Sequence, residues 1–328
     1  MGALLLAAVV AAALAACAAV ADPAFDAAAH AEMGRQPGAY TNGEARAFLV
    51  VKDGREAGLL WGTYHTAYAA ETVMPRAIRE RFQQASDLTV EVVMDRLGKA
   101  RVDGIRRGMV ADLTEVDQAA ADRLDPATRA VLDGVEVPQA FRGTVSLLGW
   151  NLLVGSRAVR RDAAVTPQVG FVDLNLMGFA RSRSIPVFGL EQAEAQLAAT
   201  RIEPNGADAE RMLRRTIRTE ASAKPFMSWT LSAYGKGDIA GLMAGMSGYM
   251  AEPPDLVQQD LYRAPLLTRR NAAWVPQLVR RFAQPGFHFV AFGAGHLVGE
   301  DGVVALLRAQ GLQVLACPAD ACPAVAAP

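Results

Sequence analysis

One pattern occurs twice in this sequence and constrains the fold more than any other feature. An apolar run leads into Gly-x-x-His, first at Leu59 to His65 and again at Phe287 to His296. The early motif reads Gly62-Thr-Tyr-His65, and the late motif reads Gly293-Ala-Gly-His296. An apolar run that ends at a glycine predicts a buried strand that turns sharply at its end. Each histidine is therefore expected just beyond the carboxyl end of a strand.

Similar elements follow both motifs. After the early motif the pattern predicts a helix over 73–85 and a strand over 88–94, and after the late motif a helix over 301–310 and a strand over 312–316. Strand-helix-strand units usually form parallel crossovers, whose ligands gather at the carboxyl ends of the strands. The sequence thus predicts an α/β fold with a mostly parallel or mixed central sheet, built from two related halves whose histidines meet at one site.

Other segments add a hairpin and helices to this plan. The apolar runs 47–51 and 59–61 flank Asp53-Gly54, a dipeptide typical of a β-hairpin turn. Helical patterns over about 102–161 predict an inserted helical layer, and further helices are predicted between 207 and 282. Residues 42–328 are interpreted as a single α/β domain.

The N-terminus has the composition of an export signal. Residues 1–21 are apolar, rich in alanine and uncharged, and a retained anchor helix is the second interpretation. Leu14-Ala-Ala-Cys17 resembles the bacterial lipobox, which predicts lipidation of Cys17; the alternative is cleavage after Ala21 to give a soluble protein. Residues 22–41 show no period, so a flexible tether is expected there.

The charge balance and the cysteines indicate which partners and which cellular compartment to expect. The 33 Lys and Arg nearly balance the 34 Asp and Glu, and no basic block is present, which argues against nucleic acid as a partner. If Cys17 is lipidated or removed, Cys317 and Cys322 remain as a pair, for which we predict a disulfide in an oxidising compartment rather than two unpaired thiols. We expect an exported protein, either periplasmic or an outer-membrane lipoprotein of a bacterium.

Two glutamates occupy positions where a fold of this class presents functional side chains. Glu91 interrupts an apolar strand, and a buried carboxylate is costly unless it is paired or binds a metal; an outward-facing edge position is the alternative. Glu191 lies between an apolar strand and a helix, which suits a functional acid and equally suits an acid that stabilises a helix N-terminus.

The two histidines with Glu91 make a two-His, one-carboxylate set that leaves a coordination position for water, as hydrolytic metal sites do. Satisfied structural histidines are the alternative. The sequence contains no His-Glu-x-x-His and no Gly-x-Ser-x-Gly, so the zinc-protease helix and the serine-hydrolase elbow are excluded. Gly299 is one residue too far for a dinucleotide fingerprint, and Glu300-Asp301 would repel a pyrophosphate, so no nucleotide is expected.

Five segments together resemble the TraB/GumN family. In order they are Leu60-Trp-Gly-Thr-Tyr-His65, Val90-Glu91, Gly189-Leu-Glu191, Arg270-Asn271 and Phe292 to Gly299. The family is similar to the Tiki proteases, which are membrane-tethered metal-dependent peptidases with paired Gly-x-x-His motifs, and to erythromycin-esterase-like and ChaN-like folds. This chain departs from the Tiki proteins in its lipobox and in lacking a C-terminal anchor helix, so peptidase activity is an extrapolation.

The resemblance implies a metal or catalytic role for His65 and His296, and it matches acidic positions to Glu91 and Glu191 and a basic one to Arg270. We therefore predict a divalent transition metal, Mn, Co or Zn, held by His65, Glu91 and His296. Glu191 would act as general base, and Arg270 would stabilise an oxyanion or orient a substrate carboxylate. The glycines Gly62, Gly293 and Gly295, and Asn271, would support the motifs.

The predicted function is an exported metal-dependent hydrolase, with a peptide bond as the favoured target and a peptide or small molecule as substrate. The alternative is a non-catalytic envelope lipoprotein that binds a metal, haem or a polysaccharide-export partner. The position of Glu191 separates the two hypotheses, because catalysis needs a base beyond the ligands and binding does not.

Overall fold

The computed structural model describes residues 23–64, 74–94, 97–114, 122–137, 143–160, 172–200, 203–250 and 264–325. The contacts divide the chain into two compact units. The first is drawn from residues 96–169 and 200–227, and the second from residues 19–95, 170–199 and 228–328. The predicted signal segment, Cys17 and His65 lie outside the described residues.

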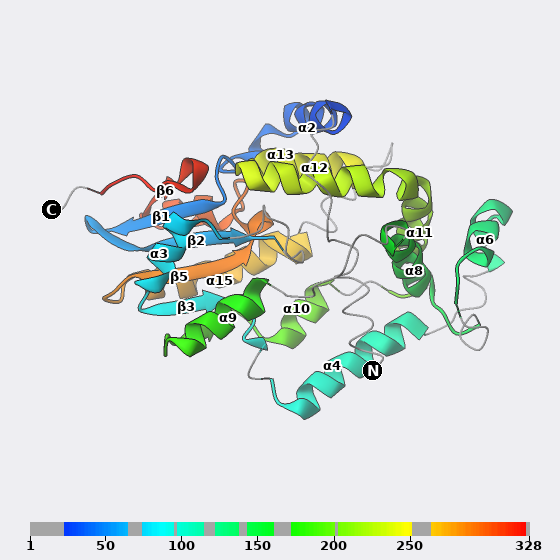
Figure 1. Cartoon of the computed structure of the whole chain (residues 1–328), viewed down its shortest axis with the longest axis horizontal. Coiled ribbons are helices and arrows are strands. Elements are labelled where there is room, and N and C mark those ends of the chain that lie inside the picture. Colours follow the sequence, from blue (N-terminus) through cyan, green and yellow to red (C-terminus); the bar gives the residue numbers. More distant parts are fainter. Residues whose placement is uncertain are drawn as a thin grey trace. The chain divides into compact units, whose positions relative to one another are not determined.

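The second unit contains a six-stranded mixed sheet, which confirms the predicted α/β class (Figure 1). The strands are β1 (Ala47–Lys52), β2 (Arg55–Thr63), β3 (Asp87–Val90), β4 (Val187–Gly189), β5 (His288–Gly293) and β6 (Gln313–Ala316). Their order is β4-β3-β5-β2-β1-β6. The neighbours from β4 to β2 pair in parallel, whereas β1 runs antiparallel to both β2 and β6.

The register of the sheet follows from a tight hairpin and a parallel pair. Asp53 and Gly54 join β1 to β2 with φ angles of 51° and 75°, as the mirror-image hairpin turn requires. In the parallel pair of β2 with β5, Gly62 lies opposite Phe292 and Thr63 opposite Gly293. The two strands that carry Gly-x-x-His motifs are therefore neighbours and end at the same edge of the sheet.

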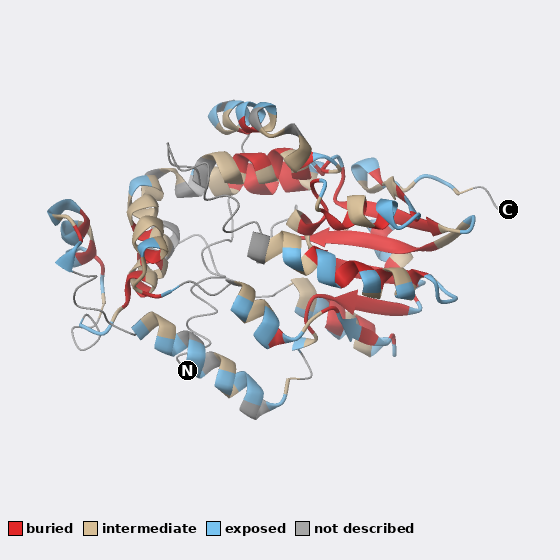
Figure 2. Ribbon diagram, turned by 180° about the vertical axis from the view of Figure 1, so that it is seen from behind, coloured by how far each residue is buried: buried red, intermediate tan, exposed pale blue. Residues whose placement is uncertain are grey.

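Both faces of this sheet are covered by helices, which explains why its strands are continuous apolar runs. On one face α3 (Arg76–Gln83) and α9 (Val172–Ser182) pack on the sheet through Ile78, Phe82 and Met177. The helices α15 (Arg269–Phe282) and α16 (Val303–Ala309) contact each other, and Trp274 of α15 packs against Phe292 of β5. Figure 2 shows buried residues along the strands.

The predicted repeat is present. β2 is followed by α3 and β3, and β5 is followed by 3-10 helix η6 (Ala294–His296), α16 and β6. The remaining elements of this unit are 3-10 helix η1 (Pro37–Tyr40), α10 (Ala193–Thr200), α12 (Ala223–Lys236), which begins in the first unit, α13 (Ile239–Met250), π-helix η5 (Ala264–Thr268) and 3-10 helix η7 (Pro318–Asp320).

The expected flexible tether is wrong over most of its length. Residues Pro23–Arg35 form helix α2, which packs along α13 (Figure 1). Trp229 donates its indole N–H to Asp26 at 2.7 Å, and both Ala29 and Glu32 are buried. This segment has almost no amphipathic pattern, so the helix is stabilised by contacts with residues distant in the sequence. The local hydrophobic period therefore did not predict it.

The described part of the first unit consists of helices joined by turns, which matches the predicted helical insertion. Its helices are α4 (Lys99–Thr114), α6 (Pro126–Asp133), α8 (Leu147–Arg160) and α11 (Ala207–Thr219), followed by the 3-10 helix η4 (Glu220–Ser222). Val154 and Leu213 lie in a separate apolar core between α8 and α11. Asp125 caps α6 by accepting from the Thr128 N–H at 2.8 Å.

Covalent and ionic contacts hold the end of the second unit. The structure joins Cys317 to Cys322 by a disulfide. Within the closed loop, Asp320 forms a two-pronged ion pair with Arg46, whose guanidinium also lies 5.2 Å from the ring centroid of Trp61. Within the described ranges, no helix is both long enough and apolar enough to cross a membrane.

Candidate functional site

Each of the four parallel strands is followed by one of the predicted site residues. In sheet order, Glu191 follows β4, Glu91 follows β3, His296 follows β5 and His65 follows β2 in the sequence. Carboxyl ends of parallel strands meet at one edge of a sheet, where α/β folds bind ligands. The structure brings Glu91, Glu191 and His296 together there with Arg270 of α15, whereas His65 lies outside the described residues.

Arg270 joins the three other groups. Its Nη2 donates to Glu91 Oε2 at 2.5 Å and to Glu191 Oε1 at 2.6 Å, and its Nη1 lies 3.1 Å from His296 Nε2. The side chains of Arg270, Glu91 and Glu191 are only 11%, 6% and 10% exposed. Burial lowers the pKa of Arg270, but the two carboxylates outweigh this effect and raise it above its usual value. The guanidinium therefore stays charged at any ordinary pH.

Glu91 is buried and fully engaged, which accounts for a carboxylate inside an apolar strand region. Its Oε1 accepts the backbone N–H of Gly293 at 2.7 Å, and its Oε2 accepts from Gln196 at 2.7 Å as well as from Arg270. Glu91 thus ties the start of the late Gly-x-x-His motif to α10 and α15. The alternative of an outward-facing edge glutamate is wrong, because Glu91 is only 5% exposed.

The protonation pattern of His296 follows from its neighbours. Asn271 donates its side-chain N–H to the Asp301 carbonyl at 2.9 Å, so its Oδ1 faces His296 Nδ1 at 2.6 Å. An amide oxygen only accepts, so Nδ1 must carry a proton. Arg270 only donates, so Nε2 presents its lone pair to the guanidinium. In this arrangement His296 is a neutral imidazole whose basic nitrogen faces the charged cluster.

Trp274, which the sequence reasoning did not identify, forms one wall of this site. Its ring lies 4.4 Å from the His296 ring and 4.7 Å from the Arg270 guanidinium, and its Nε1 donates to Glu191 Oε2 at 3.3 Å. Trp274 is four residues after Arg270 in α15, and residues at this spacing share one helix face. The four-residue spacing from Arg270 was the sequence signal that could have identified Trp274 as a site residue.

The early motif is fixed by two tyrosines. Tyr234 of α12 donates to the Gly62 carbonyl at 2.7 Å, and the Tyr64 hydroxyl lies 2.8 Å from Thr230 Oγ1. Burial raises the pKa of Tyr64, although its hydrogen bond with Thr230 opposes the shift. Both rings hold the end of β2 against α12, immediately before His65 in the sequence.

Gly62 is needed because the two motifs approach each other closely. A Cβ at this position would lie 2.6 Å from Leu297 Cδ1 and 2.9 Å from the Cα of Ala294, which belongs to the late motif. We expect Gly62→Ala to destabilise the chain by about 1–3 kcal/mol, because backbone must move to relieve the overlap. Denaturation by urea, followed by circular dichroism, measures this change.

Gly178→Ala is the matched control for that substitution. Gly178 is exposed in the interior of α9 and a Cβ there would meet nothing within 4 Å. Alanine at this position should therefore stabilise the chain by about 0.5–1 kcal/mol through helix propensity. Equal effects of the two substitutions would contradict the close approach of the motifs.

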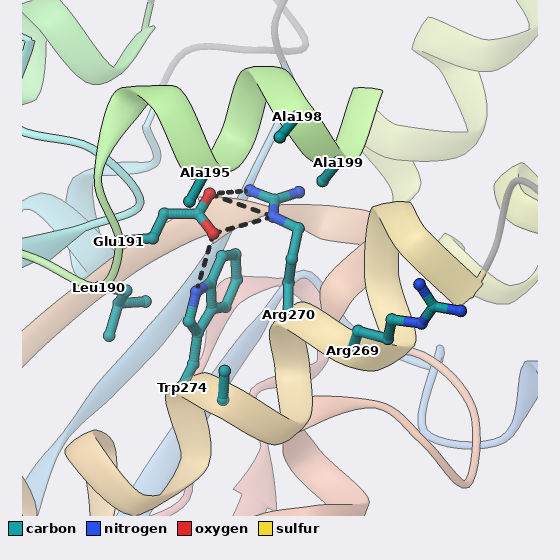
Figure 3. A pocket seen from close by; sticks show the side chains of 9 residues that line it. Leu190, Glu191, Ala195, Ala198, Ala199, Arg269, Arg270 and Trp274 are labelled. Carbon is teal, nitrogen blue, oxygen red and sulfur yellow. Dashed lines mark hydrogen bonds and ion pairs between the residues drawn. The ribbon is translucent and has the colours of Figure 1, made fainter. Parts of the chain in front are cut away.

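A pocket opens beside the cluster, between α10 and α15 (Figure 3). Its volume is about 420 Å³, and Glu191, Arg270 and Trp274 form its charged and aromatic side. The rest of the lining is Leu190, Ala195, Ala198, Ala199, Arg269 and Ala273. The site is thus a groove with small apolar walls that leads to the charged cluster.

The donors that the structure describes do not by themselves fit a metal ion. Glu91 Oε1 and His296 Nε2 are 3.8 Å apart, but the guanidinium of Arg270 contacts both side chains and would repel a cation between them. Within the described ranges, no group of three His, Cys, Asp or Glu residues is arranged to hold one. The metal at His65, Glu91 and His296 stays a prediction, because its third ligand lies outside these ranges.

The fold and the site define an α/β protein with a buried cluster of charged and polar side chains, and a pocket beside it, at the carboxyl edge of its parallel strands. Sequence comparison gives the family: the profile of the TraB/PrgY/gumN family matches residues 47–316. The chain belongs to this family. The match includes every strand and all residues of the cluster around Arg270.

Two curated relatives are similar over part of the chain. The uncharacterised protein YbaP of Escherichia coli (strain K12) and that of Shigella flexneri are each 33% identical over 141 residues, which are 42% of this chain. The aligned region spans about half of each relative, 47% of its length. No solved structure matches the chain.

Proposed function

We propose that this chain is an exported hydrolase that cleaves a peptide bond at the cluster of Glu91, Glu191, Arg270, Asn271 and His296. The orientation of His296 carries the proposal. Its Nδ1 proton is held by Asn271, and its Nε2 lone pair faces a buried arginine at the ligand-binding edge of the sheet. A neutral imidazole fixed in one tautomer is the usual general base of hydrolytic enzymes.

Arg270 couples the binding of substrate to the release of the His296 Nε2 lone pair. A substrate carbonyl oxygen that accepts from Arg270 Nη1 competes with His296 Nε2 for the same donor. Binding therefore frees Nε2 to take a proton from water while the guanidinium stabilises the developing oxyanion. The hydroxide adds to the carbonyl carbon. The C–N bond then breaks as Nε2–H gives its proton to the leaving amine, so the products are an acid and an amine.

The geometry favours Glu191 as an electrostatic partner over the general-base role predicted for it. Both of its oxygens accept hydrogen bonds from Arg270, and one also accepts from Trp274. Both oxygens are thus engaged by donors of the cluster, whereas a general base must present a lone pair to the proton that it takes. His296 then supplies the base and Glu191 orients Arg270, and this combination supports the hydrolase over the non-catalytic binding protein.

Export and membrane attachment belong to the same proposal. The apolar residues 1–21 and the lipobox ending at Cys17 support an exported lipoprotein. The disulfide between Cys317 and Cys322 supports an oxidising compartment, since such bonds rarely persist in a reducing cytosol. We infer a periplasmic or outer-membrane location, with contact to the membrane through the lipid. The predicted divalent metal is assigned no step here.

The test is digestion of a peptide library by the mature protein, with new termini identified by mass spectrometry. One arm contains a chelator, and the others contain Mn²⁺, Co²⁺ or Zn²⁺. We expect new termini in at least one arm, with a consistent preference around the cleaved bond. A protein that produces none in any arm would overturn the hydrolase and leave the binding protein as the better account.

A further inference from the structure

We propose that the groove between α10 and α15 binds an apolar residue with a free carboxylate, such as the C-terminal residue of a peptide. This inference rests on the proposed function, because it names the substrate class of the same site. The groove volume of about 420 Å³ is in the range of small-molecule sites. Its long walls carry methyl groups, and its inner end carries the charged cluster.

The walls select for an apolar group. Ala195, Ala198 and Ala199 lie on one face of α10, and Ala273 lies opposite them on α15. Figure 3 shows the alanines of α10 directed toward the Arg270 side of the groove. Alanine leaves the space open and offers no hydrogen bond, so an aliphatic or aromatic side chain of the ligand would replace water there at a gain in free energy.

The charges of the groove select for an anion. Among the charged residues of the lining, Glu191 pairs with Arg270, which also pairs with the buried Glu91, and Glu191 accepts a further hydrogen bond from Trp274. Arg269 is different: it is exposed and has no ion-pair partner anywhere in the described part of the chain. Its guanidinium is directed away from the Glu191 and Arg270 pair in Figure 3. The unpaired charge in the lining is therefore positive and lies at the rim.

An exposed arginine that has no ion-pair partner among the described residues can bind a carboxylate well. Its planar guanidinium offers two parallel N–H groups that match the two oxygens. A residue whose side chain lies along the alanines and whose carboxylate lies at Arg269 would stand beside Arg270, the next residue of the chain. Arg270 contacts His296, so the bound residue is adjacent to the proposed reacting groups.

The experiment is calorimetric titration of the full mature chain with N-acetyl-L-leucine and with its neutral amide. We expect the carboxylate to bind about tenfold or more tightly, as one charge-assisted hydrogen-bonded pair implies. R269Q should bring the two affinities together. R280Q is the matched control, because Arg280 is also an exposed arginine of α15 and does not line the groove, so it should keep the preference.

A second variant tests the walls. Ala198→Leu places a larger side chain in the groove at an exposed helical position and should weaken both probes without altering the fold. Equal affinity for acid and amide, no binding of either, or a preference that survives R269Q would each overturn the inference. The titration measures binding and not cleavage, so a preference for the carboxylate would support the groove proposal even if no peptide were cleaved. If peptides are cleaved but the carboxylate is not preferred, the groove proposal fails and the proposed hydrolase does not.

Discussion

Arg270→Met is expected to lower the stability of the chain by about 3–5 kcal/mol, the usual effect of removing one partner from a buried ion pair. The reason is specific to this cluster. Glu91 and Glu191 are 6% and 10% exposed, and both take their main charge-assisted hydrogen bonds from Arg270. Methionine fills a similar volume but leaves two carboxylates close together with no cation between them.

Thermal unfolding measures this effect. For a domain of this size the loss corresponds to a melting temperature lower by roughly 6–20 °C. Arg269→Met is the control: the neighbouring arginine is exposed and unpaired within the described chain, so its loss should change stability by no more than about 0.5 kcal/mol. Equal melting temperatures for the Arg269 and Arg270 variants at neutral pH would show that the cluster is not held by Arg270.

His296→Ala is expected to reduce hydrolysis by about 10²–10⁴-fold, the contribution typical of a general acid-base group. In the proposed reaction His296 takes the proton of water and returns it to the leaving amine, because its Nε2 faces Arg270 while its Nδ1 is held by Asn271. The rate is measured on any peptide that the library identifies.

The controls for His296→Ala separate chemistry from folding. His30→Ala removes an exposed histidine of α2 and should leave the rate unchanged. His296→Gln keeps a polar side chain in the buried position, so it should preserve the fold better than alanine while losing the activity. If either His296 variant cleaved peptides as fast as the unmodified chain, the imidazole would not be the general base.

Much of the site was predictable because it depends on local signals. The Gly-x-x-His motifs and Glu191 follow apolar runs, so these residues were expected at strand ends. Glu91 was expected inside a strand over 88–94, whereas β3 ends at Val90 and leaves Glu91 just beyond it. The grouping of Arg270 with them came from the family resemblance, since nothing in the local pattern of α15 directs its side chain toward β3, β4 and β5.

What could not be predicted depends on distant contacts. The strand order β4-β3-β5-β2-β1-β6 is set by which apolar faces meet, and the sequence of each strand is compatible with several neighbours. Helix α2 forms because it packs on α13, although its own pattern is weak. The hydrogen bond from Gln196 to Glu91 joins residues 105 positions apart and has no local signature.

The most direct test of the account is digestion of one peptide library in H₂¹⁸O by the unmodified chain and by its His296→Ala and His30→Ala variants. Mass spectrometry then counts the new carboxyl termini that carry one oxygen from water. The account predicts such termini with the unmodified chain and with His30→Ala, and at least a hundredfold fewer with His296→Ala, as loss of a general base implies. The same labelled termini at the same rate in all three samples would contradict it.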